Sequence, residues 1–129
     1  MLNETYLCFQ RRESYYAIDE SKVIRILFSK NIYELPVKED AIKGVVILDD
    51  QLVGIVDIES SDHEKYYIVI DIEGEYIGIC ADEILGYQEI PDDNWISQED
   101  EEYPFCYQDG DMNILYMMPE LVKRRFYHD

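Results

Sequence analysis

The stretch that decides the fold is residues 42–58, with the sequence I-K-G-V-V-I-L-D-D-Q-L-V-G-I-V-D-I. It contains two apolar runs, Val45–Leu48 and Leu52–Ile58, separated by the polar residues Asp49-Asp50-Gln51. Short β-branched runs on either side of a three-residue acidic turn predict a tight hairpin of buried strands. Gly44 and Gly54 indicate points where the backbone bends or another strand approaches closely. No cluster of catalytic residues lies on this hairpin, which disfavours an enzyme.

Other short strands are expected on both sides of this hairpin. Thr5–Gln10 and Ser14–Asp19 are strand-like, and Arg11-Arg12-Glu13 between them is expected to form a polar turn. Ser21 is expected to cap one helical turn before Val23–Phe28 resumes as a strand. Further strands are expected at 65–72, 76–80, 84–90, 105–108 and 112–118, with a short closing helix at 119–125.

The segment 92–103 is acidic and irregular, and Trp95 and Ile96 are expected to anchor it. Many short strands joined by small turns, without a long amphipathic helix, predict an all-β barrel or sandwich.

The chain also contains a weak internal repeat. Residues 16–26 align with residues 77–87 at an offset of 61, and residues 49–58 align with residues 109–118 at an offset of 60. The similarity lies in the pattern of strands and polar steps more than in identical residues. Two similar β lobes that share one core would explain the repeat, because each half is too small to stand alone.

Length and charge limit the function classes. The 129 residues most simply form one domain, 1–129. The net charge of −18 repels phosphate backbones and anionic lipids, so nucleic acid and membrane partners are disfavoured, whereas a basic protein surface would be attracted. No apolar run approaches the roughly 20 residues of a spanning helix. The N-terminus lacks the features of a signal peptide, so a cytoplasmic location is expected.

The three cysteines, Cys8, Cys80 and Cys106, show no C-x-x-C spacing. We expect them to be buried or half-buried thiols in a reducing cytosol.

One stretch partly matches a calcium-binding loop. Asp109, Asp111, Asn113 and Glu120 occupy positions 1, 3, 5 and 12 of an EF-hand loop. However, Ile114 stands where that loop needs glycine, and the following positions are apolar. The pattern therefore predicts a strand that leaves a hairpin turn, and no metal site is expected.

A catalytic site is also not indicated. His63 and His128 have no Cys or Ser partner at a recognisable spacing, and no nucleotide-binding or hydrolase motif occurs. We therefore expect no enzymatic activity, no catalytic residue, no cofactor and no small-molecule substrate. The twelve tyrosines are more than a core needs. Packing in the core or at its rim is the first interpretation, and some exposed tyrosine would suit a protein-binding surface.

Four stretches, in order along residues 5–122, resemble the CheW-like domain. Y-L-C-F-Q (6–10) and Y-Y-A-I-D-E-S-K-V-I-R-I (15–26) are similar to the family's opening hairpin and the turn after it. Residues 41–58 are similar to its central I-x-G-V-x-N-L-R-G-x-x-x-P-V-I-D-L. Residues 66–96 resemble its strand pair and G-x-x-V-D-x-V step, and D-G-D-M-N-I-L-Y-M-M-P-E-L (109–121) resembles its closing strand.

The resemblance implies an all-β fold of two packed small five-stranded SH3-like β-barrel lobes with short helical turns. It also implies a non-enzymatic adaptor or scaffold in bacterial chemotaxis signal transduction. Members of the family bind the regulatory domain of the histidine kinase CheA and the cytoplasmic tip of chemoreceptors, and so couple receptor to kinase.

The chain departs from the family pattern at the tip of the central hairpin. Where the family commonly has Asn-Leu-Arg-Gly, with the arginine linked to partner contacts, this chain has Ile47-Leu48-Asp49-Asp50. Partner contacts are predicted at Val37, Ile42, Asp49, Asp50 and Gln51. The reversed charge leaves an alternative open: a divergent CheW-like interaction module with a different, basic protein partner and no role in receptor coupling.

Overall fold

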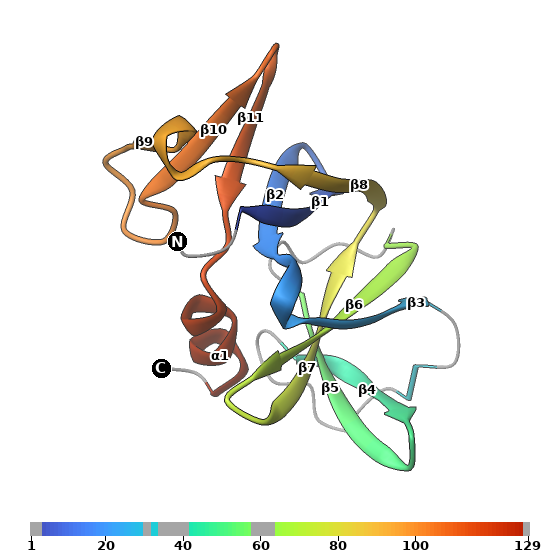
Figure 1. Ribbon diagram of the computed structural model, residues 1–129. Helices are drawn as coiled ribbons and strands as arrows, with labels where there is room; N and C mark the ends of the chain where they lie inside the picture. Colours follow the sequence, from blue (N-terminus) through green and yellow to red (C-terminus); the bar gives the residue numbers. More distant parts are fainter. Residues whose placement is uncertain (1–3, 30–31, 34–41, 58–63, 128–129) are drawn as a thin grey trace.

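The computed structural model describes residues 4–29, 32–33, 42–57 and 64–127, and within these ranges the chain forms two mixed β-sheets (Figure 1). The six-stranded sheet has the order β8-β1-β2-β11-β10-β9, and the five-stranded sheet has the order β3-β6-β7-β5-β4. The strands are β1 (Thr5–Arg11), β2 (Ser14–Asp19), β3 (Val23–Phe28), β4 (Ile42–Leu48), β5 (Gln51–Val56), β6 (Tyr66–Ile72), β7 (Glu75–Ala81), β8 (Glu83–Glu89), β9 (Ile96–Ser97), β10 (Phe105–Asp109) and β11 (Met112–Tyr116). The remaining elements are the 3-10 turns η1 (Glu20–Lys22) and η2 (Asp92–Asn94) and the helix α1 (Pro119–Tyr127).

The predicted all-β fold of two lobes is confirmed. One sheet has the five strands expected of a lobe, and the other gains a sixth through the two-residue strand β9. The closing helix predicted from Pro119 is also present. Proline suits the first turn of a helix, where its missing N–H would have no partner.

The two sheets share one connectivity. In each, an antiparallel hairpin (β1–β2 or β6–β7) lies at the centre. The second strand of that hairpin pairs in parallel with the second strand of another hairpin, β10–β11 or β4–β5. The first strand pairs with an edge strand, β8 or β3.

Equivalent residues in the strand pairs of the two sheets are separated by a constant 61 positions in the sequence. The pair Tyr16↔Leu115 in the first sheet corresponds to Ile77↔Gly54 in the second. One irregularity also matches: a register shift occurs where β8 meets β1 and at the equivalent place where β3 meets β6. A further shift near Ile42 in the β4–β5 pair has no counterpart in the β10–β11 pair. The internal repeat predicted from the sequence is therefore a repeat of structure, but the offset of 60 predicted between residues 49–58 and 109–118 is wrong by one residue, because Asp109 is equivalent to Leu48.

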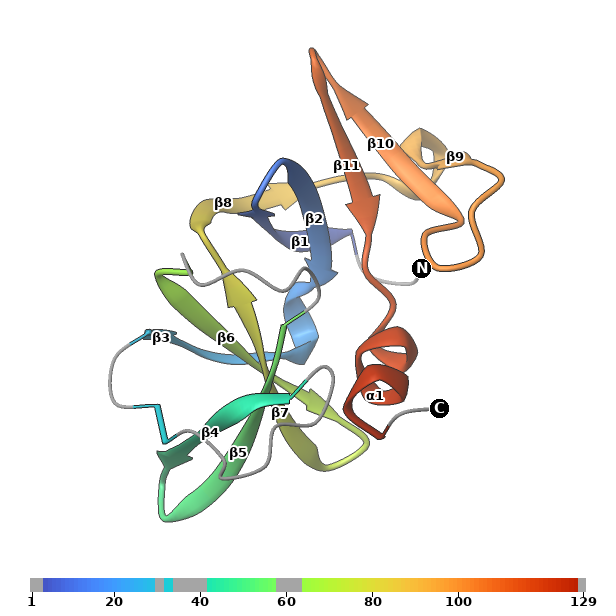
Figure 2. The same ribbon diagram turned by 180° about the vertical axis from the view of Figure 1, so that it is seen from behind.

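The two lobes exchange strands (Figures 1 and 2). β3 follows β2 along the chain but joins the sheet of β6, and β8 follows β7 but joins the sheet of β1. One core cluster contains Leu7, Phe9 and Ile18 from the first sheet together with Ile70 and Ile77 from the second. The edge strands and this core belong to both halves, and each sheet also has a smaller cluster of its own, around Val53 and Val69 in one and around Tyr6 and Ile114 in the other.

The central hairpin forms as predicted, but its turn is tighter. Gln51 pairs with Leu48, so the turn contains only Asp49 and Asp50, and the predicted three-residue turn is wrong. Asp49 and Asp50 have φ values of 52° and 65°. Positive φ at both central residues is the signature of a type I′ turn, whose twist matches that of the flanking strands. Gly44 marks a close approach, since a Cβ there would lie 2.6 Å from the Tyr33 carbonyl oxygen.

Three local predictions near the N-terminal hairpin and in the acidic segment are wrong. Arg11 belongs to β1 and is buried, so the first turn contains only Arg12 and Glu13. Asp19, and not Ser21, caps η1: its carboxylate accepts a hydrogen bond from the Ser21 backbone N at 2.9 Å. Ile96 is 55% exposed and does not anchor the segment in the core, although it pairs with Cys106 at the edge of the sheet.

Other predictions hold. Trp95 is buried and meets the ring of Tyr6 edge-on, with the ring centroids 5.3 Å apart. All three cysteines are free and buried. Asp109 ends β10 and pairs with Met112 of β11, so Gly110 and Asp111 form the turn of the predicted hairpin.

Candidate protein-binding surfaces

The tip of the β4–β5 hairpin exposes apolar side chains beside two carboxylates. Ile47 and Leu52 are 56% and 71% exposed, and they are cross-strand partners. Residues directly opposite each other in an antiparallel pair place their side chains on the same face. Tyr33 extends this face, because it pairs with Val45 and is itself 58% exposed. We call the exposed set Tyr33, Ile47, Asp49, Asp50 and Leu52 the tip surface.

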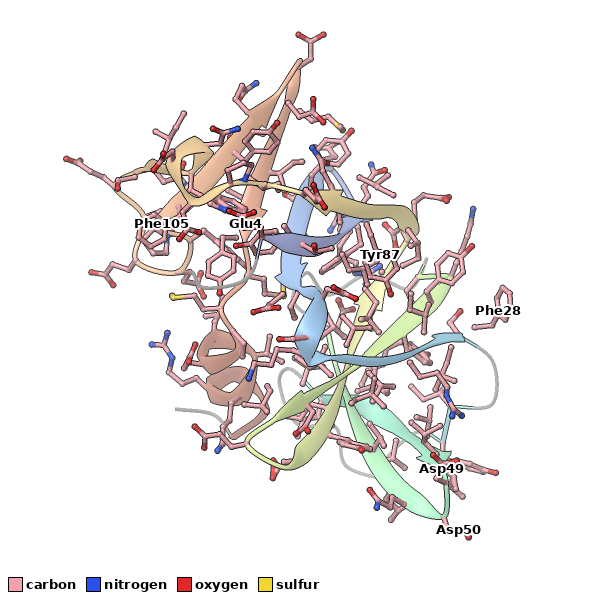
Figure 3. The ribbon with its side chains drawn as sticks, in the orientation of Figure 1. Glu4, Phe28, Asp49, Asp50, Tyr87 and Phe105 are labelled. Carbon is pink, nitrogen blue, oxygen red and sulfur yellow. The ribbon has the colours of Figure 1, made fainter. Side chains whose placement is uncertain are left out.

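The acidic turn of the tip surface projects from the molecule at the end opposite to the β10–β11 hairpin (Figures 1 and 3). The nearest described cation, Arg25 of β3, lies 3.9 Å from the Asp49 carboxylate, and both side chains are more than half exposed. Exposed pairs of this kind contribute about 0–1 kcal/mol. The two carboxylates therefore remain available to a partner.

The structure brings together only part of the predicted contact set. Asp49, Asp50 and Gln51 are exposed and adjacent at the tip. Ile42 lies at the opposite end of β4, where it is half-buried and pairs with Val56. Val37 lies outside the described residues.

The prediction that the whole hairpin is buried missed the apolar part of the tip. Ile47 alternates along β4 with the buried Val46 and Leu48. Its exposure therefore follows from the two-residue period of a strand with only one face in the core. The two-residue period of the strand predicts this exposure, but residues 45–48 are all apolar, so the sequence shows no difference between the buried and the exposed face.

A second set of exposed apolar residues lies on the edge strands β3 and β8. Ile24 and Leu85 are 40% and 44% exposed. Each is the residue left unpaired at the register shift of its strand, and the two are related by the offset of 61. A bulge re-aims a side chain, which accounts for two large apolar residues that face outward at equivalent places.

Two aromatic residues add to this second set. Tyr87 on β8 is 58% exposed, and Phe28 at the end of β3 is 69% exposed (Figure 3). Phe28 packs on Tyr66 with ring centroids 5.6 Å apart and lines a shallow recess at the start of β6. We call Ile24, Phe28, Leu85 and Tyr87 the edge surface.

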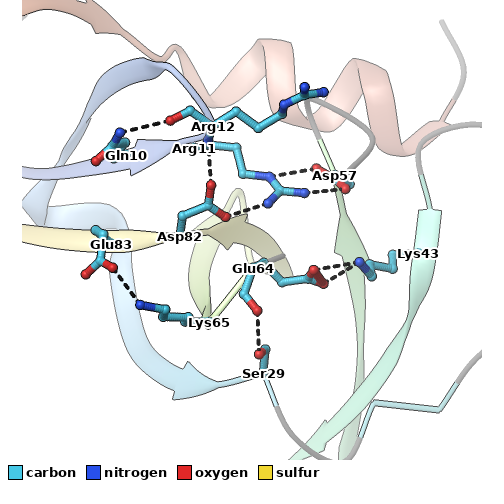
Figure 4. A network of polar contacts seen from close by, with 10 residues as sticks. All are labelled: Gln10, Arg11, Arg12, Ser29, Lys43, Asp57, Glu64, Lys65, Asp82 and Glu83. Carbon is cyan, nitrogen blue, oxygen red and sulfur yellow. Dashed lines mark hydrogen bonds and ion pairs between the residues drawn. The ribbon is translucent and has the colours of Figure 1, made fainter. Parts of the chain in front are cut away.

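A buried ion network lies between the lobes (Figure 4). Arg11 Nε donates to Asp57 Oδ1 at 3.0 Å and Nη2 to Oδ2 at 2.6 Å, while Nη1 donates to Asp82 at 2.6 Å. The second Asp82 oxygen accepts from the Arg12 backbone N at 2.6 Å. The Arg11 side chain is 0% exposed, and those of Asp57 and Asp82 are 9% and 21% exposed. Burial disfavours the charged guanidinium, but the hydrogen bonds to Asp57 and Asp82 and the charge of Asp57 outweigh it and raise the pKa of Arg11.

A second ion pair lies close to this network. Lys43 Nζ donates to a Glu64 carboxylate oxygen at 2.7 Å, and the Glu64 side chain is 5% exposed. Nearby, burial and the Asp57 and Glu64 charges raise the pKa of the Cys80 thiol. Burial likewise raises the pKa of Cys8 to about 11. Neutral, enclosed thiols of this kind are poor nucleophiles.

The described part of the chain contains neither a metal-binding cluster nor a membrane-spanning helix. Among those residues, no group of three or more His, Cys, Asp or Glu is placed to hold a metal ion. The same residues contain no helix that is both long and apolar enough to cross a membrane.

Two interlocked β lobes that present apolar side chains at separate places define a protein-interaction domain of the scaffold type. A family model described as "CheW-like domain" matches residues 5–106, so the chain belongs to this family of chemotaxis scaffold and adaptor proteins. The fold is similar to that in the crystal structure of the scaffolding protein TtCheW from Thermoanaerobacter tengcongensis. The TM-score is 0.81 at 14% sequence identity, over 92% of this chain and 86% of that one. No curated protein is significantly similar to this chain in sequence.

Proposed function

We propose that this protein is a cytoplasmic, non-enzymatic adaptor that couples chemoreceptors to the histidine kinase CheA. Membership of the CheW-like family is the observation that carries the proposal. Two exposed apolar surfaces on different strands support it, because an adaptor must hold two partners at once. Exposed apolar clusters of this kind are typical of protein contact sites.

The mechanism is simultaneous occupancy. The tip surface engages the regulatory domain of the kinase, with Leu52 and Ile47 as apolar anchors. Asp49, Asp50 and the adjacent Gln51 are the polar contacts around them. The edge surface engages a receptor helix through Leu85 and Tyr87. No catalytic group, cofactor or small-molecule substrate takes part in this mechanism.

Binding assays with two matched variants test the assignment. Leu52→Ser and Leu85→Ser each shorten one exposed leucine, and exposed substitutions change stability by only about 0.5 kcal/mol. We expect Leu52→Ser to weaken binding of the kinase regulatory domain about tenfold, or roughly 1.4 kcal/mol, while leaving binding of the receptor tip fragment unchanged. Leu85→Ser should do the reverse, so each variant is the control for the other. If calorimetry shows that the native protein binds neither fragment, the coupling role is abandoned.

A different, basic protein partner is the second candidate, and the acidic turn is the observation that favours it. Asp49 and Asp50 stand where the family commonly has Arg-Gly, and the whole chain carries a charge of −18. Binding that weakens steeply between low and high salt would favour such a partner, because salt screens exposed charges. If the variant Asp49→Arg instead binds the kinase domain tightly, the chain differs from its family at a single partner contact, and the kinase remains its partner.

A further inference from the structure

Arg11 joins β5, which carries part of the tip surface, to β8, which carries Leu85 and Tyr87 of the edge surface. Asp57 directly follows β5, the strand that begins with Gln51 and Leu52 at the tip. Asp82 is the single residue between β7 and β8, the strand that carries Leu85 and Tyr87 of the edge surface. The Arg11 guanidinium binds both carboxylates at once (Figure 4). If the end of β5 moved relative to the start of β8, at least one of the contacts from Arg11 to Asp57 or Asp82 would lengthen.

We propose that Arg11 is a positioning residue that holds the tip surface and the β8 part of the edge surface, Leu85 and Tyr87, in one relative arrangement and thereby couples their occupancy. This inference rests on the proposed function insofar as it assumes one partner at each surface. The arrangement of the two surfaces, however, is a property of the protein alone and can be measured without partners.

The geometry of the network suits this role. A guanidinium is planar, and two parallel N–H groups bound to one carboxylate fix its orientation as well as its distance. The remaining Nη1 contact, to Asp82, then fixes the direction of the segment that enters β8. Apolar packing holds groups together but is far less directional.

The internal repeat shows that the fold does not require charge at this junction. At the offset of 61, Arg11 corresponds to Ile72, Asp57 to Met118 and Asp82 to Ser21. Ile72 is buried in the shared core, so the equivalent junction on the other side of the molecule is built without an ion pair. Replacing a buried ion pair by well-packed apolar groups is often neutral or stabilising. What the charged junction adds is therefore directional positioning, which the shared core alone does not supply.

The test replaces the charged residues of this junction by the residues found at the equivalent, uncharged junction. The triple variant Arg11→Ile, Asp57→Met, Asp82→Ser carries the residues of the uncharged junction. The single variant Arg11→Lys keeps the charge but loses the paired N–H geometry. Lys123→Met is the matched control, since it removes a cation from an exposed pair with Glu73. The affinity of the kinase regulatory domain is measured by calorimetry with and without a saturating receptor tip fragment, and residual dipolar couplings report the relative orientation of the two sheets.

For the native protein and Lys123→Met, we expect the receptor fragment to change kinase affinity by about fivefold or more, within the usual range of coupling between sites. In the triple variant and in Arg11→Lys, each partner should still bind when added alone. The receptor fragment should change kinase affinity by a factor that falls toward one. The residual dipolar couplings of the two sheets should no longer fit a single alignment tensor. Unaltered coupling or sheet alignment in Arg11→Lys would overturn the proposal, even if the triple variant fails to fold. So would native protein that binds both partners without any coupling. If neither partner binds, the proposed function fails, whereas the alignment measurement still decides the role of Arg11.

Discussion

Replacing Arg11 by methionine should destabilise this protein more than removal of any exposed cation. The side chain is fully buried, and its loss removes the two hydrogen bonds that it donates to Asp57, whose side chain is only 9% exposed. Removing one partner of a buried ion pair costs about 3–5 kcal/mol, because an uncompensated charge stays in a poorly solvated place. For a domain of this size we expect a fall in Tm of roughly 10–20 °C.

Urea denaturation measures this loss directly. Trp95 is the single tryptophan of the chain and is buried, so its fluorescence reports unfolding. The midpoint should fall while the slope with denaturant stays constant, which identifies a change in stability alone.

Lys123→Met is the matched control, because it makes the same replacement in a pair whose side chains are 37% and 77% exposed. Its effect should be about 1 kcal/mol or less. If Arg11→Met costs no more than this control, the network is not a buried, satisfied ion pair in solution. A second variant, Asp57→Asn, removes the charge that faces Arg11 and should lie between the two.

Three further predictions concern the backbone and the thiols. Asp50→Gly should stabilise the protein by about 0.5–1 kcal/mol in urea denaturation, because glycine adopts the positive φ of 65° without strain, whereas Asp50→Val should destabilise it. Gly44→Ala should cost about 1–3 kcal/mol, since the new Cβ would lie 2.6 Å from the Tyr33 carbonyl oxygen; a neutral result would show that this segment yields easily. The pKa of Cys8 is raised in the fold from 9.0 to about 11. The protonated thiol is therefore favoured by folding, so its contribution to stability should be complete below pH 9 and lost as pH rises through 11; Cys8→Ala should flatten that part of the pH profile.

The sequence by itself determined the hairpins and the repeat. Both are local in origin, because β-branched runs around short polar breaks specify strands and turns. The same order of strands and turns recurs about 61 residues later in the sequence. The family followed from the same segments in sequence, and the match over residues 5–106 confirms it. The exposure of Asp49 and Asp50 was also predictable, because a short polar turn between two strands faces solvent.

Only the tertiary structure decided which residues of those strands meet across the two halves. Arg11 was predicted to lie in a polar turn, since nothing nearby in the sequence indicates that Asp57 and Asp82 will enclose it. The exposure of Ile24 and Leu85 depends on two bulges, and the exchange of β3 and β8 depends on a core that both halves build. The burial and charge pairing of Arg11 depend on contacts with Asp57 and Asp82, which lie 46 and 71 positions further along the chain. Local sequence patterns do not predict contacts over such separations.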